Sequence, residues 1–331
     1  MSGRVAPAKR PRIEPRKRPP EERIRDFLEV SLELTAEEAQ SEAARCIKCK
    51  NPACEQACPL NNRIRDWLVL TAEGRFLEAA ECSRQTSNMP EICGRICPQD
   101  RLCEGACVLG IKYEPVAIGA IEWFINEYAF RQLGGIPHPE IAPATGERVA
   151  VVGAGPAGLA CAEELVKRGY RVTVFEAWPF PGGLLIYGIP NFKLEKWVVE
   201  RRIAYLRALG VEFVCGIRIG EHVTLDDLFA QGYSAIFLGT GATIPKRPKI
   251  EGIELKGIHD ALPFLIRNNV EQRFLPPGDW RRDDLTGKTV VVLGGGDTAM
   301  DSLRTARRLG AARVICAYRR DEENMPGSRR E

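Results

Sequence analysis

The stretch RVAVVGAGPAGLACAEELVKRGYRVTVFE, residues 148–176, decides the fold class of this 331-residue chain. It predicts an apolar strand over 148–152, a glycine-rich turn, a helix over 157–168 and a second strand over 171–175. The first glycine of such a turn permits tight bending, the second lets the backbone approach a pyrophosphate, and the third allows close helix packing. The stretch therefore predicts an α/β fold with a Rossmann-like dinucleotide site.

A carboxylate ends the second strand of this unit, at Glu176. At that position a carboxylate accepts a ribose hydroxyl and repels a 2′-phosphate, which favours FAD at this loop. Residues 235–242 predict a buried strand that ends in a glycine turn beneath the cofactor, and the loops over 181–190 are rich in small residues. The predicted cofactor-binding residues of this site are Gly153, Gly155, Pro156, Ala157, Gly158, Glu176, Gly183, Leu184, Gly188, Ile189, Pro190, Thr240, Gly241 and Ala242.

The same strand, turn and helix pattern recurs over residues 289–317. Its glycine turn has alanine in the third place, which the fingerprint allows. Here the second strand is followed by arginines instead of a carboxylate, and guanidinium groups can clamp a 2′-phosphate. A solvated strand end is the alternative explanation. The predicted NADPH-binding residues are Gly294, Gly296, Asp297, Thr298, Ala299, Arg319 and Arg320.

Nine of the twelve cysteines lie together before these units. Eight of them form two groups that each contain a Cys-Pro step, and Cys82 has no partner at ligand spacing. The first group, Cys46-x2-Cys49-x4-Cys54-x3-Cys58-Pro59, resembles the ferredoxin run in which the cysteine before proline ligates a different cluster. Crossed ligation predicts two [4Fe-4S] clusters. One would be held by Cys46, Cys49, Cys54 and Cys107, and the other by Cys58, Cys97 and Cys103 with one further ligand.

Two residues are candidates for that further ligand. Spacing favours Cys93, whereas Glu122 is a less usual carboxylate ligand. A structural zinc site is the alternative to iron, because thiolates at such spacings also bind zinc. The gaps of four and five residues and the paired Cys-Pro steps favour iron–sulfur clusters.

Composition excludes several classes of protein. With 47 Lys and Arg against 44 Asp and Glu, the net charge of +3 is too small for a broad nucleic-acid-binding field. The apolar run over 149–162 is interrupted by three glycines and a proline and is too short to span a membrane. The N-terminus has no apolar export segment, so we expect a cytoplasmic protein whose cysteines bind metal and do not form disulfides.

Five segments follow from these patterns. Residues 1–25 hold nine Lys or Arg and several prolines, which predicts a basic arm that is either a solvated tail or a partner-docking segment. A helical iron–sulfur domain is expected over 26–130, with helices after a capping box at Thr35 and around 64–70 and 75–82. A linker over 131–147, an FAD-binding domain over 148–280 and the start of an NADPH-binding domain over 281–331 complete the prediction.

The chain resembles the small (β) subunits of NADPH-dependent glutamate synthase. The resemblance rests on the two cysteine groups and on GAGPAGLACA (153–162), FEAWPFPGGLLIYGIPNFKL (175–194), FLGTGA (237–242), GGGDTAMDSLRTARRLGA (294–311) and YRRDEENMPGSRRE (318–331). The same module occurs in dihydropyrimidine dehydrogenase and in a ferredoxin:NADP oxidoreductase.

The resemblance implies a flavoprotein oxidoreductase in which electrons from NADPH reach a partner through FAD and two [4Fe-4S] clusters. It implies that Glu122 is the odd cluster ligand, which would make Cys93 a bystander. Its implied partner is the glutamate synthase large subunit, while ferredoxin or a pyrimidine-reducing partner and a non-catalytic metal-binding module are alternatives. Hydride transfer needs no acid–base side chain, so no catalytic residue is predicted. Family members continue beyond the position of Glu331, so we expect an incomplete second nucleotide domain.

Overall fold

The computed structural model describes residues 6–329, and the chain divides into two compact units. The first unit comprises residues 1–19 and 29–138, and the second comprises residues 20–28 and 139–331. Across the described residues, no helix is both long enough and apolar enough to cross a membrane. The domain boundaries expected from the sequence stay predictions.

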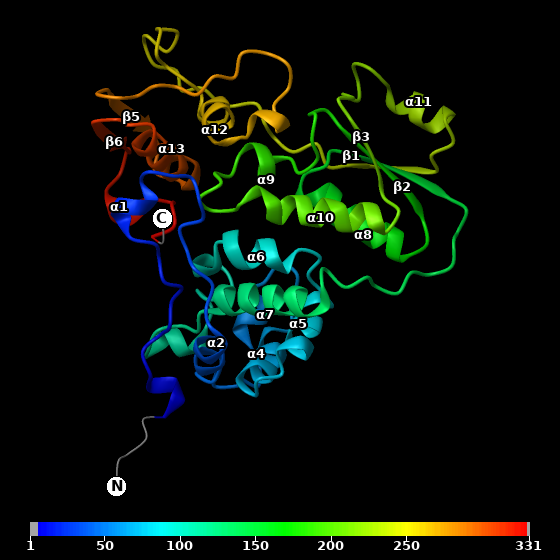
Figure 1. Ribbon diagram of the computed structural model, residues 1–331, viewed down its shortest axis with the longest axis vertical. Helices are drawn as coiled ribbons and strands as arrows, with labels where there is room; N and C mark the ends of the chain where they lie inside the picture. The colour runs from blue at the N-terminus through cyan, green and yellow to red at the C-terminus, as the bar shows by residue number, and fades with distance from the viewer. Residues whose placement is uncertain (1–5, 330–331) are drawn as a thin grey trace. The chain divides into compact units, whose positions relative to one another are not determined.

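The first unit is helical and is built around one long helix, α7 (Ile118–Leu133) (Figure 1). Four shorter helices pack against it: α2 (Ala36–Ala43), α4 (Ile64–Ala72), α5 (Phe76–Arg84) and α6 (Pro90–Ile96). Trp67, Ile121 and Phe124 lie in the core between them. The loops carry α3 (Ala53–Gln56) and the 3₁₀ turns η1 (Pro7–Lys9), η2 (Gln99–Arg101) and η3 (Val108–Ile111).

Local sequence signals set the start of α2. The Glu38 amide donates to Thr35 Oγ1 at 3.2 Å, and the Thr35 amide donates to Glu38 Oε2 at 2.8 Å. This reciprocal pair satisfies two amides that a helix N-terminus would otherwise leave unbonded. The predicted capping box is confirmed, and so are the helices predicted near residues 64 and 75.

The second unit contains a four-stranded parallel sheet in the order β3-β2-β1-β4 (Figure 1). Its strands are β1 (Arg148–Val152), β2 (Arg171–Glu176), β3 (Glu212–Cys215) and β4 (Ala235–Leu238). Helix α8 (Pro156–Lys167) packs on β1 and β2, and α10 (Lys196–Ala208) packs on α8. The shorter helices are α9 (Leu184–Tyr187) and α11 (Leu225–Ala230). Because the strands are parallel, β1, β2 and β4 have their carboxyl ends at the same end of the sheet, where dinucleotides bind in such folds.

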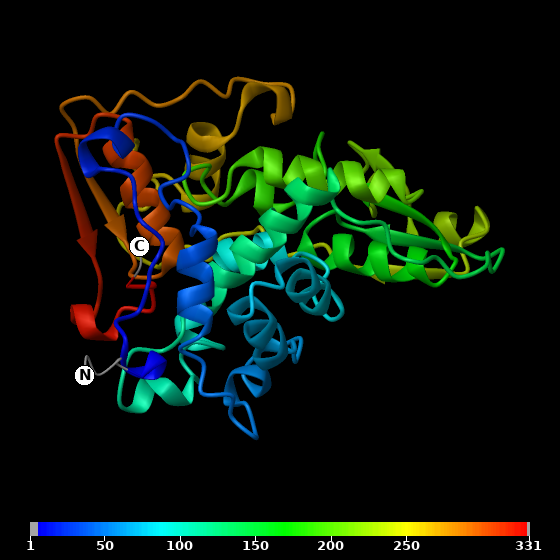
Figure 2. The same ribbon diagram turned by 60° about the horizontal axis from the view of Figure 1, so that its bottom comes forward.

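A second, two-stranded parallel sheet pairs β5 (Thr289–Leu293) with β6 (Arg313–Ala317). Helix α13 (Asp297–Arg308) packs along this sheet, and α12 (Ala261–Asn269) packs on α13 (Figure 2). The short turns η4 (Gln272–Phe274) and η5 (Glu322–Asn324) lie in the connections. Both predicted strand–turn–helix–strand units are present, so the α/β fold class with an N-terminal helical domain is confirmed.

Two local expectations are wrong. Residues 235–238 form a strand, but it lies at the sheet edge, where Phe237 is 37% exposed and Leu238 is 59% exposed. Apolar sequence alone does not distinguish an edge strand from a central one. The loop expected over 181–190 contains the helix α9, whose residues Leu185, Ile186 and Tyr187 are buried.

The basic arm is not a solvated tail over its described part. Arg18 donates its amide to Val30 O at 2.9 Å in the first unit. Residues Pro20–Leu28, which include α1 (Pro20–Arg23), belong to the second unit. There Asn191 Nδ2 donates to Phe27 O at 2.9 Å, and Arg308 Nε donates to Asp26 O at 2.8 Å. Within the arm itself, Ile13 donates its amide to Glu42 Oε2 at 2.7 Å and Arg10 O accepts from Arg45 Nε at 3.0 Å, so the expectation of a solvated tail fails. Residues 1–5 of the predicted arm lie outside the described residues.

Candidate functional site

Four cysteines line one hollow in the first unit. The thiols are those of Cys46, Cys49, Cys54 and Cys107. They come from the end of α2, the loop before α3, α3 itself and the residue before η3. The first predicted ligand set is therefore gathered at one place, although its members span 62 positions of sequence, 46 to 107.

Burial disfavours the thiolate form of two of these cysteines, Cys46 and Cys54. Burial raises the pKa of Cys46, and burial together with the neighbouring Cys107 and Cys46 raises the pKa of Cys54 to about 12. Thiols held neutral in an apolar pocket are inert toward solvent. Iron at their centre would reverse this preference, because a bound cation stabilises the thiolates that ligate it.

The second predicted ligand set also gathers in the first unit. Burial raises the pKa of the Cys103 thiol, and the nearby charges of Glu104, Glu122 and Cys58 raise it further. The Cys93 thiol is hydrogen-bonded to Cys97, which raises the pKa of Cys93. Cys103 therefore has Cys58 and Glu122 as neighbours, and Cys93 has Cys97 and Glu122 as neighbours.

Glu122 carries an unusual carboxyl group. Its side chain is half-buried, but protein atoms crowd the carboxyl, and this burial raises its pKa well above the usual range. The negative charges of Cys93 and Glu91 act in the same direction, while a hydrogen bond from Ser83 opposes them. A protonated carboxyl beside thiols is what a carboxylate ligand would be without its metal. The choice between Glu122 and Cys93 as the last ligand stays a prediction.

A single metal ion and a cluster place different demands on these groups. Over residues 6–329, no three His, Cys, Asp or Glu side chains are grouped as ligands of one metal ion. A zinc ion holds sulfur ligands about 2.3 Å from its centre, so its thiolates must converge tightly. A four-iron cluster is larger, and its thiolates stand further apart. The four cysteines that line the hollow equal in number the thiolate ligands of such a cluster.

The first glycine turn has the geometry of a dinucleotide cradle. Gly153 has a φ of 100°, and a Cβ there would lie 2.4 Å from Gly239 O. Gly183 approaches Gly155 so closely that a Cβ on Gly183 would lie 2.7 Å from Gly155 Cα. Thr240 Cα lies on the same side of Gly153. The structure thus brings three predicted loops together, and this bare backbone surface at the N-terminus of α8 fits a pyrophosphate.

Glu176 lies at the end of β2 and is 6% exposed. Its Oε2 accepts the Ala154 amide at 2.8 Å, and its Oε1 accepts the Trp178 amide at 2.9 Å. Each carboxylate oxygen has a second lone pair, so a ribose hydroxyl can still donate to it. Gly241, Ala242 and Leu184, which were also predicted, are exposed.

The loop over residues 185–194 is held by a buried lysine that the sequence did not single out. Lys196 Nζ donates to the carbonyl oxygens of Leu185 at 2.9 Å, Ile189 at 2.5 Å and Leu194 at 3.2 Å. Its side chain is 2% exposed, and this burial lowers the pKa of Lys196 to about 7. Three carbonyl acceptors match the three hydrogens of an ammonium group. Lys196 therefore fixes the loop that carries the predicted Gly188, Ile189 and Pro190.

The second glycine turn directly follows the carboxyl end of β5. Gly294 has a φ of 134° and donates its amide to Ala317 O at 2.9 Å. Asp297 begins α13, and its Oδ1 accepts the Ser328 amide at 2.8 Å. Since β5 and β6 are parallel, the exposed Arg319 and Arg320 follow β6 at the same edge as the turn. Thr298 is exposed, and Gly296 and Ala299 are at least partly buried.

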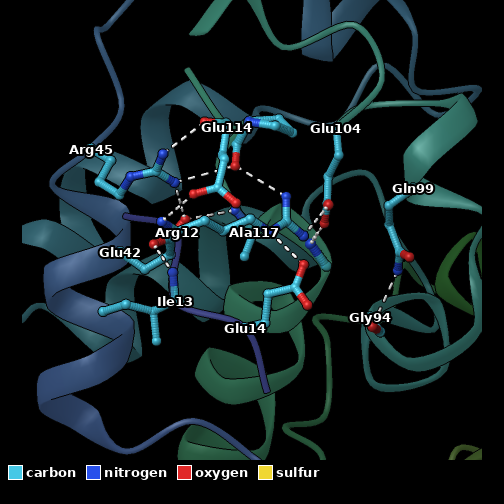
Figure 3. A network of polar contacts seen from close by, with 12 residues as sticks. Arg12, Ile13, Glu14, Glu42, Arg45, Gly94, Gln99, Glu104, Glu114 and Ala117 are labelled. Atoms are coloured by element: carbon cyan, nitrogen blue, oxygen red, sulfur yellow. Dashed lines mark hydrogen bonds and ion pairs between the residues drawn. The ribbon is translucent and has the colours of Figure 1, made fainter. Parts of the chain in front are cut away.

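Sequence reasoning missed a polar network in the first unit (Figure 3). Arg45 and Glu42 form an ion pair of 2.7 Å within it, and both side chains are almost completely buried. Arg12 and Glu104 form another, of 2.6 Å. The i,i+3 spacing of Glu42 and Arg45 in and after a helix was an available signal. Arg12 gave none, because it stands in a run of basic residues that resembles a solvated segment.

Two family models match the chain. Dihydropyrimidine dehydrogenase domain II, 4Fe-4S cluster, matches residues 23–133, and pyridine nucleotide-disulphide oxidoreductase matches residues 147–327. The glutamate synthase [NADPH] small chain of Escherichia coli (strain K12) is 49% identical over 97% of this chain and 68% of its own length. That of Halomonas elongata is 48% identical over 97% of this chain and 67% of its own length.

The chain belongs to the glutamate synthase small-chain family. It is an oxidoreductase with an iron–sulfur domain followed by a Rossmann-like domain, and it is an electron-transfer subunit. It spans about two thirds of the length of the glutamate synthase small chains it matches. It is also similar to the putative oxidoreductase AegA of Escherichia coli (strain K12), at 46% identity over 97% of this chain and 49% of that protein.

Proposed function

We propose that this chain is the electron-input flavoprotein of a glutamate synthase. NADPH is its reductant, and its partner is a large subunit that forms glutamate from glutamine and 2-oxoglutarate. The observation that carries the proposal is the hollow lined by Cys46, Cys49, Cys54 and Cys107, on a chain that also has two glycine turns at strand ends. A chain that binds a nicotinamide and also gathers thiols in this way is suited to convert hydride into single electrons.

The cofactors we assign are FAD, NADPH and two [4Fe-4S] clusters. When bound, FAD would supply the exchange between two-electron and one-electron chemistry, and the clusters would carry single electrons. The bare backbone at Gly153, Gly155 and Gly158 accepts a pyrophosphate, and Glu176 accepts a ribose hydroxyl. Lys196 holds the adjoining loop.

The remaining predicted residues would bind the 2′-phosphate of NADPH and the iron of the clusters. Arg319 and Arg320, at the same edge as the second glycine turn, are placed to contact a 2′-phosphate. The thiols of the two cysteine groups ligate iron, with Glu122 as the odd ligand of the second cluster. Thiolate ligation of iron requires reduced cysteines, so we assign the protein to the cytoplasm.

A second candidate function keeps the same module and changes the acceptor. The similarity to the putative oxidoreductase AegA favours it, because that protein matches the same 97% of the chain. Ferredoxin or a pyrimidine-reducing partner would then receive the electrons. A non-catalytic metal-binding module is the third candidate.

The deciding experiment measures iron, zinc and flavin per chain on anaerobically purified protein, followed by NADPH oxidation with each acceptor. We expect about eight iron atoms, as two four-iron clusters require, and bound FAD. NADPH-dependent glutamate formation with a glutamate synthase large subunit would support the first function. Activity with ferredoxin and none with glutamine and 2-oxoglutarate would favour the second. Zinc without iron would refute both and leave the metal-binding module.

A further inference from the structure

Part of the basic arm is built into the iron–sulfur domain. The Ile13 amide donates to Glu42 Oε2 at 2.7 Å, and Arg45 Nε donates to Arg10 O at 3.0 Å (Figure 3). Glu42 and Arg45 are 0% and 1% exposed. Backbone groups that bond to buried charged side chains are fixed more firmly than groups on a solvated surface. The arm segment Arg10–Ile13 is therefore a structural part of this domain.

Arg12 places its positive charge on one buried carboxylate. Its Nη2 donates to Glu104 Oε2 at 2.6 Å, and its Nη1 donates to Pro115 O at 3.0 Å. The side chains of Arg12 and Glu104 are 8% and 2% exposed. The other oxygen of Glu104, Oε1, accepts the Gly119 amide at 3.0 Å. A carboxylate this deeply buried is costly unless its charge is neutralised, and Arg12 neutralises it.

Glu104 directly follows the proposed cluster ligand Cys103 and touches it in two ways. Its backbone amide donates to Gln99 O at 2.9 Å and also interacts with the Cys103 sulfur, and its negative charge acts on that sulfur. Reduction potentials of iron–sulfur clusters are set by net charge, by hydrogen bonds to the sulfurs and by exposure. The pair of Arg12 and Glu104 affects both the net charge near Cys103 and the hydrogen bonding of its sulfur.

We propose that Arg12 is a positioning residue for the cluster that Cys103 ligates. It neutralises Glu104 and holds that residue so that its amide faces the Cys103 sulfur. The inference rests on the proposed function, because it requires a cluster at Cys103. It assigns to the basic arm a role in setting the electron affinity of one cluster.

The test is a charge cycle read by cluster potentials. The variants are R12Q, E104Q, the double variant R12Q/E104Q and R12K, each in the holoprotein. The control is R16Q, because Arg16 is exposed and its ion pair with Glu38 is 3.8 Å long. Midpoint potentials of both clusters are measured by redox titration with electron paramagnetic resonance, at one fixed pH for all variants. Iron content and thermal unfolding are recorded for each variant.

We expect opposite shifts in the single variants. R12Q leaves the Glu104 charge unbalanced, which disfavours adding an electron and lowers the potential of one cluster. E104Q removes the buried partner of Arg12 and leaves it only the exposed Glu14, 3.1 Å away, so the potential of the same cluster should rise. In the double variant and in R12K, the midpoint potential should differ from the parent value by only a small fraction of the shift in either single variant. R16Q should leave the potentials of both clusters unchanged.

Other outcomes would overturn the inference. Shifts of the same sign in both single variants, or unchanged potentials in both, would mean that Arg12 has no electrostatic role. If R12Q loses its cluster, a double variant that keeps the cluster at the parent potential supports the proposal, and a double variant that also loses it refutes the proposal. Absence of iron from the parent protein would instead refute the proposed function, and this would be seen before any variant is compared.

Discussion

A single added methyl group should separate what the first glycine turn does for folding from what it does for cofactor binding. A Cβ on Gly158 would lie 1.9 Å from Gly153 O and 3.2 Å from Val151 Cγ1. Real Cβ atoms essentially never approach within 3.0 Å of another atom, so the start of α8 would have to move away from β1 by about 1 Å. Because the obstacle is backbone, we expect Gly158→Ala to lower the free energy of unfolding by about 3 kcal/mol.

Gly155→Ala should behave differently. The residue has a φ of −76° and a ψ of −176°, which alanine adopts without strain, and its Cβ would meet only Gly183 Cα, at 3.9 Å, among the described residues. Restricting the unfolded chain should make this variant as stable as the parent or up to about 1 kcal/mol more stable. The same methyl group would occupy the surface that a pyrophosphate needs, so FAD affinity should fall tenfold or more, equivalent to about 1.4 kcal/mol.

Two measurements on the same proteins decide the matter. Urea unfolding of flavin-free protein gives the free energy of unfolding, and quenching of flavin fluorescence gives the affinity for FAD. The two variants serve as controls for each other, since each adds one methyl group to the same turn. The reasoning is refuted if Gly155→Ala unfolds as readily as Gly158→Ala, or if Gly155→Ala binds FAD as tightly as the parent.

Three further predictions concern the buried Lys196, the odd cluster ligand and the second nucleotide site. Because burial lowers the pKa of Lys196 to about 7 from 10.5, the unfolded chain binds more protons between these values, so stability should rise with pH across that window. The stability difference between parent and Lys196→Met, followed by urea unfolding, isolates this rise, and a pH-independent difference would contradict it. Glu122→Ala should alter the electron paramagnetic resonance signal of one cluster and Cys93→Ala should leave both signals unchanged; the reverse pattern would make Cys93 the ligand. Replacing Arg319 and Arg320 with alanine should weaken NADPH binding tenfold or more, with NADH binding unchanged, because each charge-assisted bond to a 2′-phosphate contributes about 1.5–3 kcal/mol; equal losses for both nucleotides, measured by titration, would exclude 2′-phosphate recognition.

Sequence alone determined the features that depend on neighbouring residues. The strands over 148–152, 289–293 and 313–317 lie where the sequence predicts them, because alternating apolar runs and glycine turns act over a few residues. The capping box of α2 was equally local. The spacing of the cysteines predicted four that line one hollow, although they lie between positions 46 and 107 of the sequence.

Only the tertiary structure decided the features that join distant parts of the chain. Arg12 and Glu104 are 92 residues apart, and Glu42 reaches Ala117 across 75 residues. The edge position of β4 and the burial of Lys196 likewise depend on which elements pack beside them. The residues next to a position in sequence do not predict such distant partners. Buried ion pairs and strand order are set only when separate helices and strands pack together and exclude water.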